Sequence, residues 1–187
     1  MIRRVVAVVV AVAVLALSGC AQSYDGVLWR QMDSAEGGFV ARITTLRETG
    51  ATRADAVAAL KRDTYWDGGA VPASLGPTAA AVLTHGYRWE PGDASYAEEV
   101  VLVLDVFASS GLRDEAPLHG DVGTSAVMAY DGPPAVYTCF SVRIHFLDDR
   151  LASWYRPWDD SEQSCPNVLV DRLDDGAQYV PIHEFDG

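Results

Sequence analysis

Hydrophobic residues follow three patterns along the chain, and each pattern predicts a different kind of element. Residues 5–17 form an unbroken run of Val, Ala and Leu. Between residues 34 and 62 the apolar positions recur at helical spacing, and from residue 99 onward they follow the patterns of strands. Helices first and antiparallel strands afterwards predict an α+β fold.

The first helical pattern follows Ser34, which is a suitable N-cap for a helix beginning at Ala35. Gly50 is a suitable residue to end this helix. The apolar positions between them recur at i, i+4 and i+7, which is one face of a helix: Phe39, Ile43 and Leu46. Residues 20–33 are expected to be a tether that precedes the folded domain of residues 34–187.

A second helix is predicted from the sequence Thr52–Asp55, which has the residues of a capping box. Val57 and Leu60 lie on one face of this helix. Lys61 and Arg62 follow near its C-terminal end, where the helix dipole favours positive charge. Beyond a loop, residues 79–89 are expected to form a short helix and then a strand.

Strand patterns fill much of the remaining chain. Residues 99–107 are rich in Val and Leu, which predicts a strand buried on both faces. Residues 135–147 give the clearest strand, and Asp148-Asp149 then turns the chain into residues 151–156, which predicts a hairpin. Two shorter candidates are residues 124–130 and 168–173.

The strand of residues 135–147 predicts the two faces of the sheet. One set of side chains is mostly apolar: Val136, Thr138, Phe140, Val142, Ile144 and Phe146. The alternate set forms what we call the mixed face: Tyr137, Cys139, Ser141, Arg143 and His145. This alternation is typical of an antiparallel sheet covered on one side. A curved sheet wrapped on N-terminal helices is the shape of cystatin-like and NTF2-like folds, which we expect by analogy.

The N-terminus has the parts of an export signal. Arg3 and Arg4 are a short positive region, and the 13 apolar residues after them are fewer than the roughly 20 of a spanning helix. The segment ends in Leu17-Ser18-Gly19-Cys20. In these four residues the chain resembles bacterial lipoproteins, whose lipobox has Leu, a small residue, Gly or Ala, and then Cys.

The resemblance implies that residues 1–19 are a lipoprotein signal peptide and that the chain is cut before Cys20. It also implies diacylglyceryl transfer to the Cys20 sulfur and acylation of the new N-terminus. Two or more acyl chains hold a protein stably on a membrane. The protein is therefore expected on the extracytoplasmic side of a cell membrane, which it contacts through lipid on Cys20.

Composition narrows the class of partner. The chain has 14 Lys and Arg against 26 Asp and Glu, a formal net charge of −12. Nucleic acid and anionic lipid headgroups are poor partners for such a surface, so no nucleic-acid partner is expected. The acidic residues 171–176 lack the alternation of an EF-hand loop. No metal and no cofactor is predicted.

Two cysteines remain once Cys20 carries lipid. In an oxidising compartment an even pair usually forms a disulfide, which predicts a bond between Cys139 and Cys165. This bond would hold the loop that carries Cys165 over the mixed face or at its edge. Two free thiols or a redox pair are the alternatives, and the spacing is not that of Cys-x-x-Cys.

Candidate chemistry is sparse, because the common motifs of hydrolases, nucleotide-binding proteins and zinc peptidases are absent from the sequence. His119 and Asp121 can place an imidazole against a carboxylate, as a general base requires. The same residues also make an ordinary polar turn. His145 lies on the mixed face beside Arg143, which can bind an anionic group. A structural cross-strand pair under the disulfide loop is the alternative.

Aromatic residues and arginine gather at residues 154–158. Such residues are frequent in interface hot spots and in carbohydrate-stacking sites. They are also common core and hairpin residues. The candidate binding residues are Trp154, Tyr155, Arg156 and Trp158, together with Arg143.

Three functions fit the sequence. The first is a lipid-anchored binding or interaction module of the cell envelope, with an envelope protein or carbohydrate as partner. The second is an extracytoplasmic, hydrolase-like enzyme with a site on the mixed face. The third is a structural accessory lipoprotein of a membrane complex. The absent motifs favour binding over catalysis, although many active sites are assembled from scattered residues.

Overall fold

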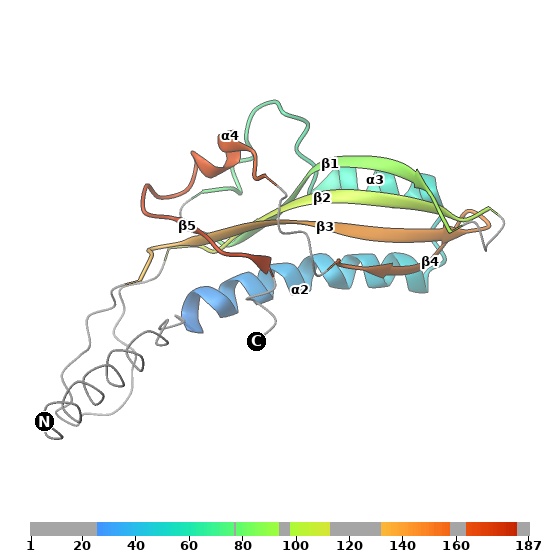
Figure 1. The fold of residues 1–187 in the computed structure, drawn as a ribbon, viewed down its shortest axis with the longest axis horizontal. Helices are drawn as coiled ribbons and strands as arrows, with labels where there is room; N and C mark the ends of the chain where they lie inside the picture. Colours follow the sequence, from blue (N-terminus) through green and yellow to red (C-terminus); the bar gives the residue numbers. More distant parts are fainter. Residues whose placement is uncertain (1–25, 77, 94–97, 113–131, 158–163, 183–187) are drawn as a thin grey trace, which may run out of the picture.

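The computed structural model describes residues 26–76, 78–93, 98–112, 132–157 and 164–182. It confirms the predicted α+β class. A long helix, α2, lies across one face of an antiparallel sheet, and the segment that carries the short helix α4 lies over part of the other face (Figure 1). The lipobox and the predicted strand of residues 124–130 lie outside the described residues.

Helix α2 (Gly26–Glu48) is longer than the sequence pattern predicted. The expected start at Ala35 is wrong, since Ser34 lies inside the helix and residues 26–33 of the expected tether are helical. The reason is burial: Leu28 and Met32 are only 2% and 4% exposed. They continue the apolar face toward the N-terminus, and packing on the sheet outweighs the capping preference of one serine.

Helix α3 (Arg53–Asp63) begins as its capping box predicts. The Asp55 backbone N–H donates to Thr52 Oγ1 at 3.2 Å, and the Thr52 backbone N–H donates to Asp55 Oδ2 at 3.1 Å. The Thr52 hydroxyl also donates to Asp55 Oδ2 at 2.7 Å, and this bond first, followed by the bond from the Thr52 backbone, lowers the pKa of the Asp55 carboxyl. Gly50 has a φ of +64° and separates the two helices as expected.

The sheet is a meander of four antiparallel strands in the order in which they occur in the chain. The strands are β1 (Ala81–Pro91), β2 (Val100–Ser109), β3 (Val136–Leu147) and β4 (Arg150–Tyr155). A two-residue strand, β5 (Gln178–Tyr179), pairs in parallel with the start of β3. The predicted β3–β4 hairpin is confirmed, and its turn residues Asp148 and Asp149 both have positive φ.

Two of the predicted elements are wrong. Residues 79–89 contain no helix, because β1 extends from residue 81 and pairs with β2 along its length. Residues 168–173 are not a strand: α4 (Asn167–Val170) is helical, and a turn follows it. Leu169 and Leu173 are both buried, so the apolar spacing that indicated a strand belongs to one face of a short helix and its turn.

The outer edge of β1 is partly covered by the loop that follows α3. The Thr84 backbone N–H donates to the Thr64 carbonyl at 2.7 Å, and the Trp66 N–H donates to the Thr84 carbonyl at 2.9 Å. This short pairing extends the sheet beside the first half of β1. It also places Trp66 over the mixed face, where it is buried.

The core lies between α2 and the apolar face of the sheet. The largest fully buried side chains there come from the helix and from the alternate positions of β2 and β3: Phe39, Ile43, Leu102, Leu104, Val106, Phe140, Ile144 and Phe146. This is the alternation that the sequence predicted for β3. The mixed face therefore lies on the side of the sheet away from α2. The segments that cover this face determine which of its side chains a ligand can reach.

Candidate functional site

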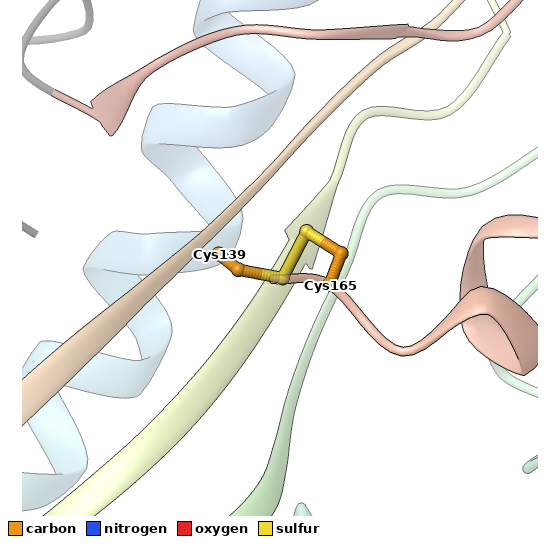
Figure 2. Close-up of a disulfide and its surroundings, with 2 residues drawn as sticks. All are labelled: Cys139 and Cys165. Atoms are coloured by element: carbon orange, nitrogen blue, oxygen red, sulfur yellow. A yellow bond between two sulfur atoms is a disulfide. The ribbon is translucent and has the colours of Figure 1, made fainter. Parts of the chain in front are cut away.

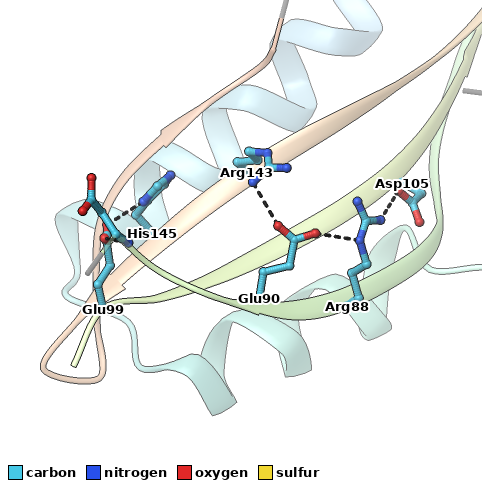
Figure 3. A network of polar contacts seen from close by, with 7 residues as sticks. Arg88, Glu90, Glu99, Asp105, Arg143 and His145 are labelled. Carbon is cyan, nitrogen blue, oxygen red and sulfur yellow. Dashed lines mark hydrogen bonds and ion pairs between the residues drawn. The ribbon is translucent and has the colours of Figure 1, made fainter. Parts of the chain in front are cut away.

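The mixed face is divided into two halves. In one, which we call the disulfide half, a second apolar cluster is buried: Trp66, Leu75, Leu83, Phe107, Cys139, Leu169 and Leu173. In the other, the charged half, polar side chains of β1, β2 and β3 and of the residue before β2 form two groups of contacts (Figure 3). The six residues are Arg88, Glu90, Glu99, Asp105, Arg143 and His145. Of these two halves, the charged half is the one whose described side chains offer charged groups to a ligand.

The disulfide half is closed by the predicted Cys139–Cys165 bond (Figure 2). The two Cα atoms are 5.5 Å apart, and Cys139 is fully buried on β3. Cys165 lies just before α4, so the bond ties α4 and the turn after it over the sheet. Leu169 and Leu173 of this segment then complete the second apolar cluster.

The charged half follows from the register of the strands. Arg88 of β1 and Arg143 of β3 lie opposite Val103 of β2 from its two sides, so they belong to one row across the sheet. The next row contains Glu90 and His145. Because strand side chains alternate between faces, all four project to the same side. Glu90 thus lies one row from Arg88 on the same strand and diagonally across β2 from Arg143, so its carboxylate can reach both arginines.

The ion pairs link these rows in a line along the sheet. Arg88 Nε donates to Glu90 Oε1 at 2.9 Å, and Arg143 Nη1 donates to Glu90 Oε2 at 3.0 Å. Arg88 Nη1 donates to Asp105 Oδ1 at 3.0 Å. The side chains stay partly open to solvent, with 50% of Arg88, 32% of Arg143 and 30% of Glu90 exposed. The line is therefore an ordered set of charges within reach of a partner.

Glu90 is held in its ionised form by these contacts. The hydrogen bond from Arg88 is the main cause that lowers the pKa of the Glu90 carboxyl, and Arg143 adds to it. Desolvation acts in the opposite direction and is outweighed. At neutral pH the line presents a carboxylate between two guanidinium groups, so it can exchange ion pairs with a charged ligand of either sign.

The second contact of the charged half joins Glu99 and His145. Glu99 Oε1 is 2.7 Å from His145 Nδ1, and Glu99 Oε2 accepts the Asp93 backbone N–H at 2.7 Å. These bonds, first that with His145, lower the pKa of Glu99. The ring of Tyr155 packs on the imidazole, with centroids 5.4 Å apart. The imidazole is thus fixed in orientation by a carboxylate on one side and by an aromatic ring.

Whether the Glu99–His145 pair can act as a general base depends on the other nitrogen of the imidazole, Nε2. His145 Nε2 is buried, and it has no hydrogen-bond partner within the described part of the chain. A general base needs this nitrogen within hydrogen-bond reach of the proton that it removes. The Glu99–His145 pair has the orientation of a catalytic dyad, but its reactive nitrogen is not accessible in this structure.

His85 lies between the two halves, at the irregularity of the β1–β2 register between Thr84 and Gly86. Burial lowers the pKa of its imidazole, and the charge of Asp105 partly opposes this effect. His85 Nε2 is buried and has no hydrogen-bond partner among the residues that the structure describes. The neutral form of His85 is therefore favoured at this boundary between the disulfide half and the charged half.

The predicted binding residues are divided between the two faces of the sheet. Trp154 packs against the α2 core, and Arg156 Nη1 bonds Glu36 of α2 at 2.5 Å. Tyr155 points to the mixed face and is 47% exposed. Adjacent strand residues alternate, so three neighbours in sequence cannot form one patch. Arg143 and His145 lie in the charged half. The predicted site residues His119, Asp121 and Trp158 lie outside the described residues.

Sequence reasoning missed four members of the charged half: Arg88, Glu90, Glu99 and Asp105. Asp105 interrupts an otherwise apolar strand, and Arg88 and Glu90 alternate with Tyr87 and Trp89. These two features were the available signal, since a charge within a buried strand must have a partner on its own face.

The comparisons with known proteins add no family: no protein-family model, no curated protein and no solved structure matches this chain. Within the described ranges, His, Cys, Asp and Glu side chains do not gather in a group of three that could hold a metal ion. No helix among the described residues is long and apolar enough to cross a membrane.

Proposed function

We propose that this protein is a lipid-anchored module of the cell envelope that binds a charged protein partner on the charged half of its mixed face. The observation that carries the proposal is the partly exposed line of ion pairs from Asp105 through Arg88 and Glu90 to Arg143. Ordered side chains of both signs lose little conformational freedom on binding and select partners by charge complementarity.

The position of the charged half supports this proposal. Helix α2 begins six residues after Cys20 and extends over 23 residues, which is about 35 Å of helix. The charged half lies toward the far end of the sheet, beside the β3–β4 turn (Figures 1 and 3). A lipid on Cys20 would hold the start of α2 near the bilayer and present the charged half away from it.

A protein is a better partner for this surface than a carbohydrate. Neutral sugars use aromatic platforms, and Trp154 of the expected aromatic cluster is packed against the core. The charged half offers guanidinium and carboxylate groups, which match the charged side chains of a protein. We propose a cystatin-like or NTF2-like shape by analogy, because α2 crosses a four-stranded meander. Folds of this kind host binding modules and enzymes alike.

The partner can be tested with a photo-crosslinking side chain in the lipidated protein in its native membrane. We expect Tyr155→p-benzoylphenylalanine to give one discrete crosslinked product. The matched control is Tyr179→p-benzoylphenylalanine, because Tyr179 is similarly exposed at 41% but lies on β5, outside the charged half. Adding Glu90→Arg should abolish the Tyr155 product. Identical products from both positions, or none from Tyr155, would contradict the proposal.

Lipidation of Cys20 is tested by a separate measurement. Intact mass of the protein purified from its native membrane should match residues 20–187 plus acyl chains. Cys20→Ser should leave the protein unlipidated and should prevent cleavage before position 20. An unlipidated wild-type mass that retains residues 1–19 would contradict the anchor and leave the binding surface unaffected.

The Glu99–His145 pair favours a second candidate, an extracytoplasmic hydrolase with His145 as general base. Its support is the short contact between Nδ1 and a carboxylate, and the buried Nε2 weighs against it. Turnover of a panel of chromogenic esters and glycosides should be compared between the wild type and His145→Gln. Activity that disappears in the variant would favour the enzyme, whereas equal or absent turnover would favour the binding module.

A further inference from the structure

A pocket lies between α2 and α3, away from the mixed face. Its volume is 190 Å³, and its wall is formed mainly by apolar side chains of the two helices: Phe39, Ile43, Leu46, Ala59 and Leu60. Phe39 and Ile43 are fully buried at its inner side, whereas Leu46, Ala59 and Leu60 are half-buried. The pocket is therefore an apolar opening that leads from the surface to the core.

The polar side chains of the wall do not make it hydrophilic. Thr45 Oγ1 donates to the Ala41 carbonyl at 2.9 Å, and Thr64 Oγ1 donates to the Leu60 carbonyl at 3.4 Å. Both hydroxyl groups are thus used within their own helix or at its end. A cavity whose polar groups are already satisfied offers little to water and favours an apolar ligand.

Arg42 is the one charged residue of this wall among the described residues. Its side chain is exposed, and its Nε donates to the Gly38 carbonyl at 3.4 Å. No described carboxylate lies within ion-pair distance of its guanidinium group, although the chain carries a net charge of −12. Arginine is well suited to bind a carboxylate through two parallel hydrogen bonds.

We propose that the α2–α3 pocket binds a free monocarboxylate with a short apolar chain, such as a medium-chain fatty acid. The chain would fill the space between Phe39 and Leu60, and the carboxylate would pair with Arg42. A cavity of 150 Å³ accepts benzene, so 190 Å³ accommodates roughly seven or eight carbon atoms. This site is independent of the charged half and of its proposed partner.

The binding experiment is titration calorimetry of octanoate into the full lipidated protein in nanodiscs, with empty nanodiscs as the blank. We expect saturable binding that strengthens about fourfold for each CH₂ from pentanoate to octanoate, because each buried CH₂ adds a similar increment. The increment should vanish beyond octanoate, when the pocket is full. Affinity that keeps rising to dodecanoate, or no heat with any member of the series, would overturn the proposal.

Two variants test the two parts of the site. Arg42→Gln should weaken octanoate about tenfold and leave 1-octanol unchanged, since only the acid loses a charged hydrogen-bond donor. The matched control is Arg47→Gln, an exposed arginine of α2 that is absent from the described wall. Ala59→Phe should fill the pocket and abolish binding of both ligands, with an unchanged circular dichroism spectrum as the check of folding.

Each contrary result has a definite meaning. Equal loss with Arg42→Gln and Arg47→Gln would overturn the role of Arg42, because net charge alone would then explain the effect. Binding that survives both Ala59→Phe and the milder Ala59→Leu in folded protein would place the ligand elsewhere and overturn the pocket.

Discussion

The two halves of the mixed face are built on the same three strands but are covered in different ways. Cys139 and Phe107 are buried under α4 and the turn after it. About 13 Å further along β3, at its rise of about 3.3 Å per residue, Arg143 is partly exposed. Val103 is nevertheless fully buried, with Arg88 and Arg143 on either side of it. Long arginine side chains can cover an apolar neighbour with their aliphatic stems, while the guanidinium groups stay partly exposed and pair with Glu90 and Asp105.

The difference shows two ways to cover the second face of a sheet whose first face is covered by a helix. A second apolar layer requires additional segments of chain. Here they are the α4 segment, which one disulfide holds on the sheet, and the loop between α3 and β1, which contributes Trp66 and Leu75. A layer of long charged side chains needs no extra chain and stays available to a partner. We expect the first half to contribute mainly stability and the second mainly recognition.

The largest effect should come from removing the bond that holds the disulfide half. Cys139→Ala with Cys165→Ala should lower the free energy of unfolding by about 3.5 kcal/mol, from the loop entropy of a separation of 26 residues. Urea denaturation of the oxidised wild type and of the double variant measures this difference. The crosslink at Tyr155 should persist in native buffer. Its loss would mean that the two halves are not separate in function.

A somewhat smaller effect is expected for the apolar side chain that α4 inserts. Leu169 is fully buried in the second cluster, so Leu169→Ala should lower the free energy of unfolding by about 3 kcal/mol through lost transfer energy and a cavity. Val168→Ala is the matched control, because Val168 is 52% exposed on the same helix. If both variants unfold at the same urea concentration, α4 does not contribute to a core.

Within the charged half, Glu90→Gln should cost only about 1 kcal/mol, because partly exposed ion pairs are largely screened. A double-mutant cycle with Arg143→Gln should give a coupling energy of about 0.5 to 1 kcal/mol. The same cycle on the more exposed Arg53–Asp149 pair should give less. A coupling of several kcal/mol at Glu90 would show that the charged half is a structural core and contradict its assignment to recognition.

The smallest effect should be a pH dependence of the free energy of unfolding that comes from Glu99. Its pKa is held below the usual 4.5, first by the bond with His145, so the unfolded chain binds more protons near that pH. The resulting stability is present above pH 4.5 and is lost as the pH falls through the lowered pKa. Glu99→Gln should make urea midpoints decline less steeply with acid than in the wild type. The matched control is Glu48→Gln, the same change of charge at the exposed end of α2.

The elements that could be predicted from the sequence are those fixed by near neighbours. The alternation of β3 and the capping box of α3 each depend on residues a few positions apart. The start of α2 was missed because Ser34 has the side chain of an N-cap, whereas the packing of Leu28 and Met32 on the sheet continues the helix through this position. A local conformational preference is worth about 1 kcal/mol per residue, which is less than the free energy gained by burying these apolar side chains.

The charged half could not be predicted in the same way, because its contacts join distant parts of the chain. Glu90 and Arg143 are 53 residues apart, and Glu99 and His145 are 46 apart. Which residues meet depends on the register of β1, β2 and β3, and a slip of one residue would reverse every side chain. His145 and Arg143 were predicted as site residues from one strand alone, and their partners required the whole sheet.

The loop that covers the outer edge of β1 has a consequence for how copies of this protein behave when they are crowded. An open strand edge is a template on which another chain can add, and such growth leads to aggregation. Here the Thr64 carbonyl and the Trp66 N–H already occupy the backbone of Thr84, and Pro91 at the other end has no N–H to donate. The stretch available for edge-to-edge growth is shortened from both ends, which favours a protein that remains dispersed at high local concentration.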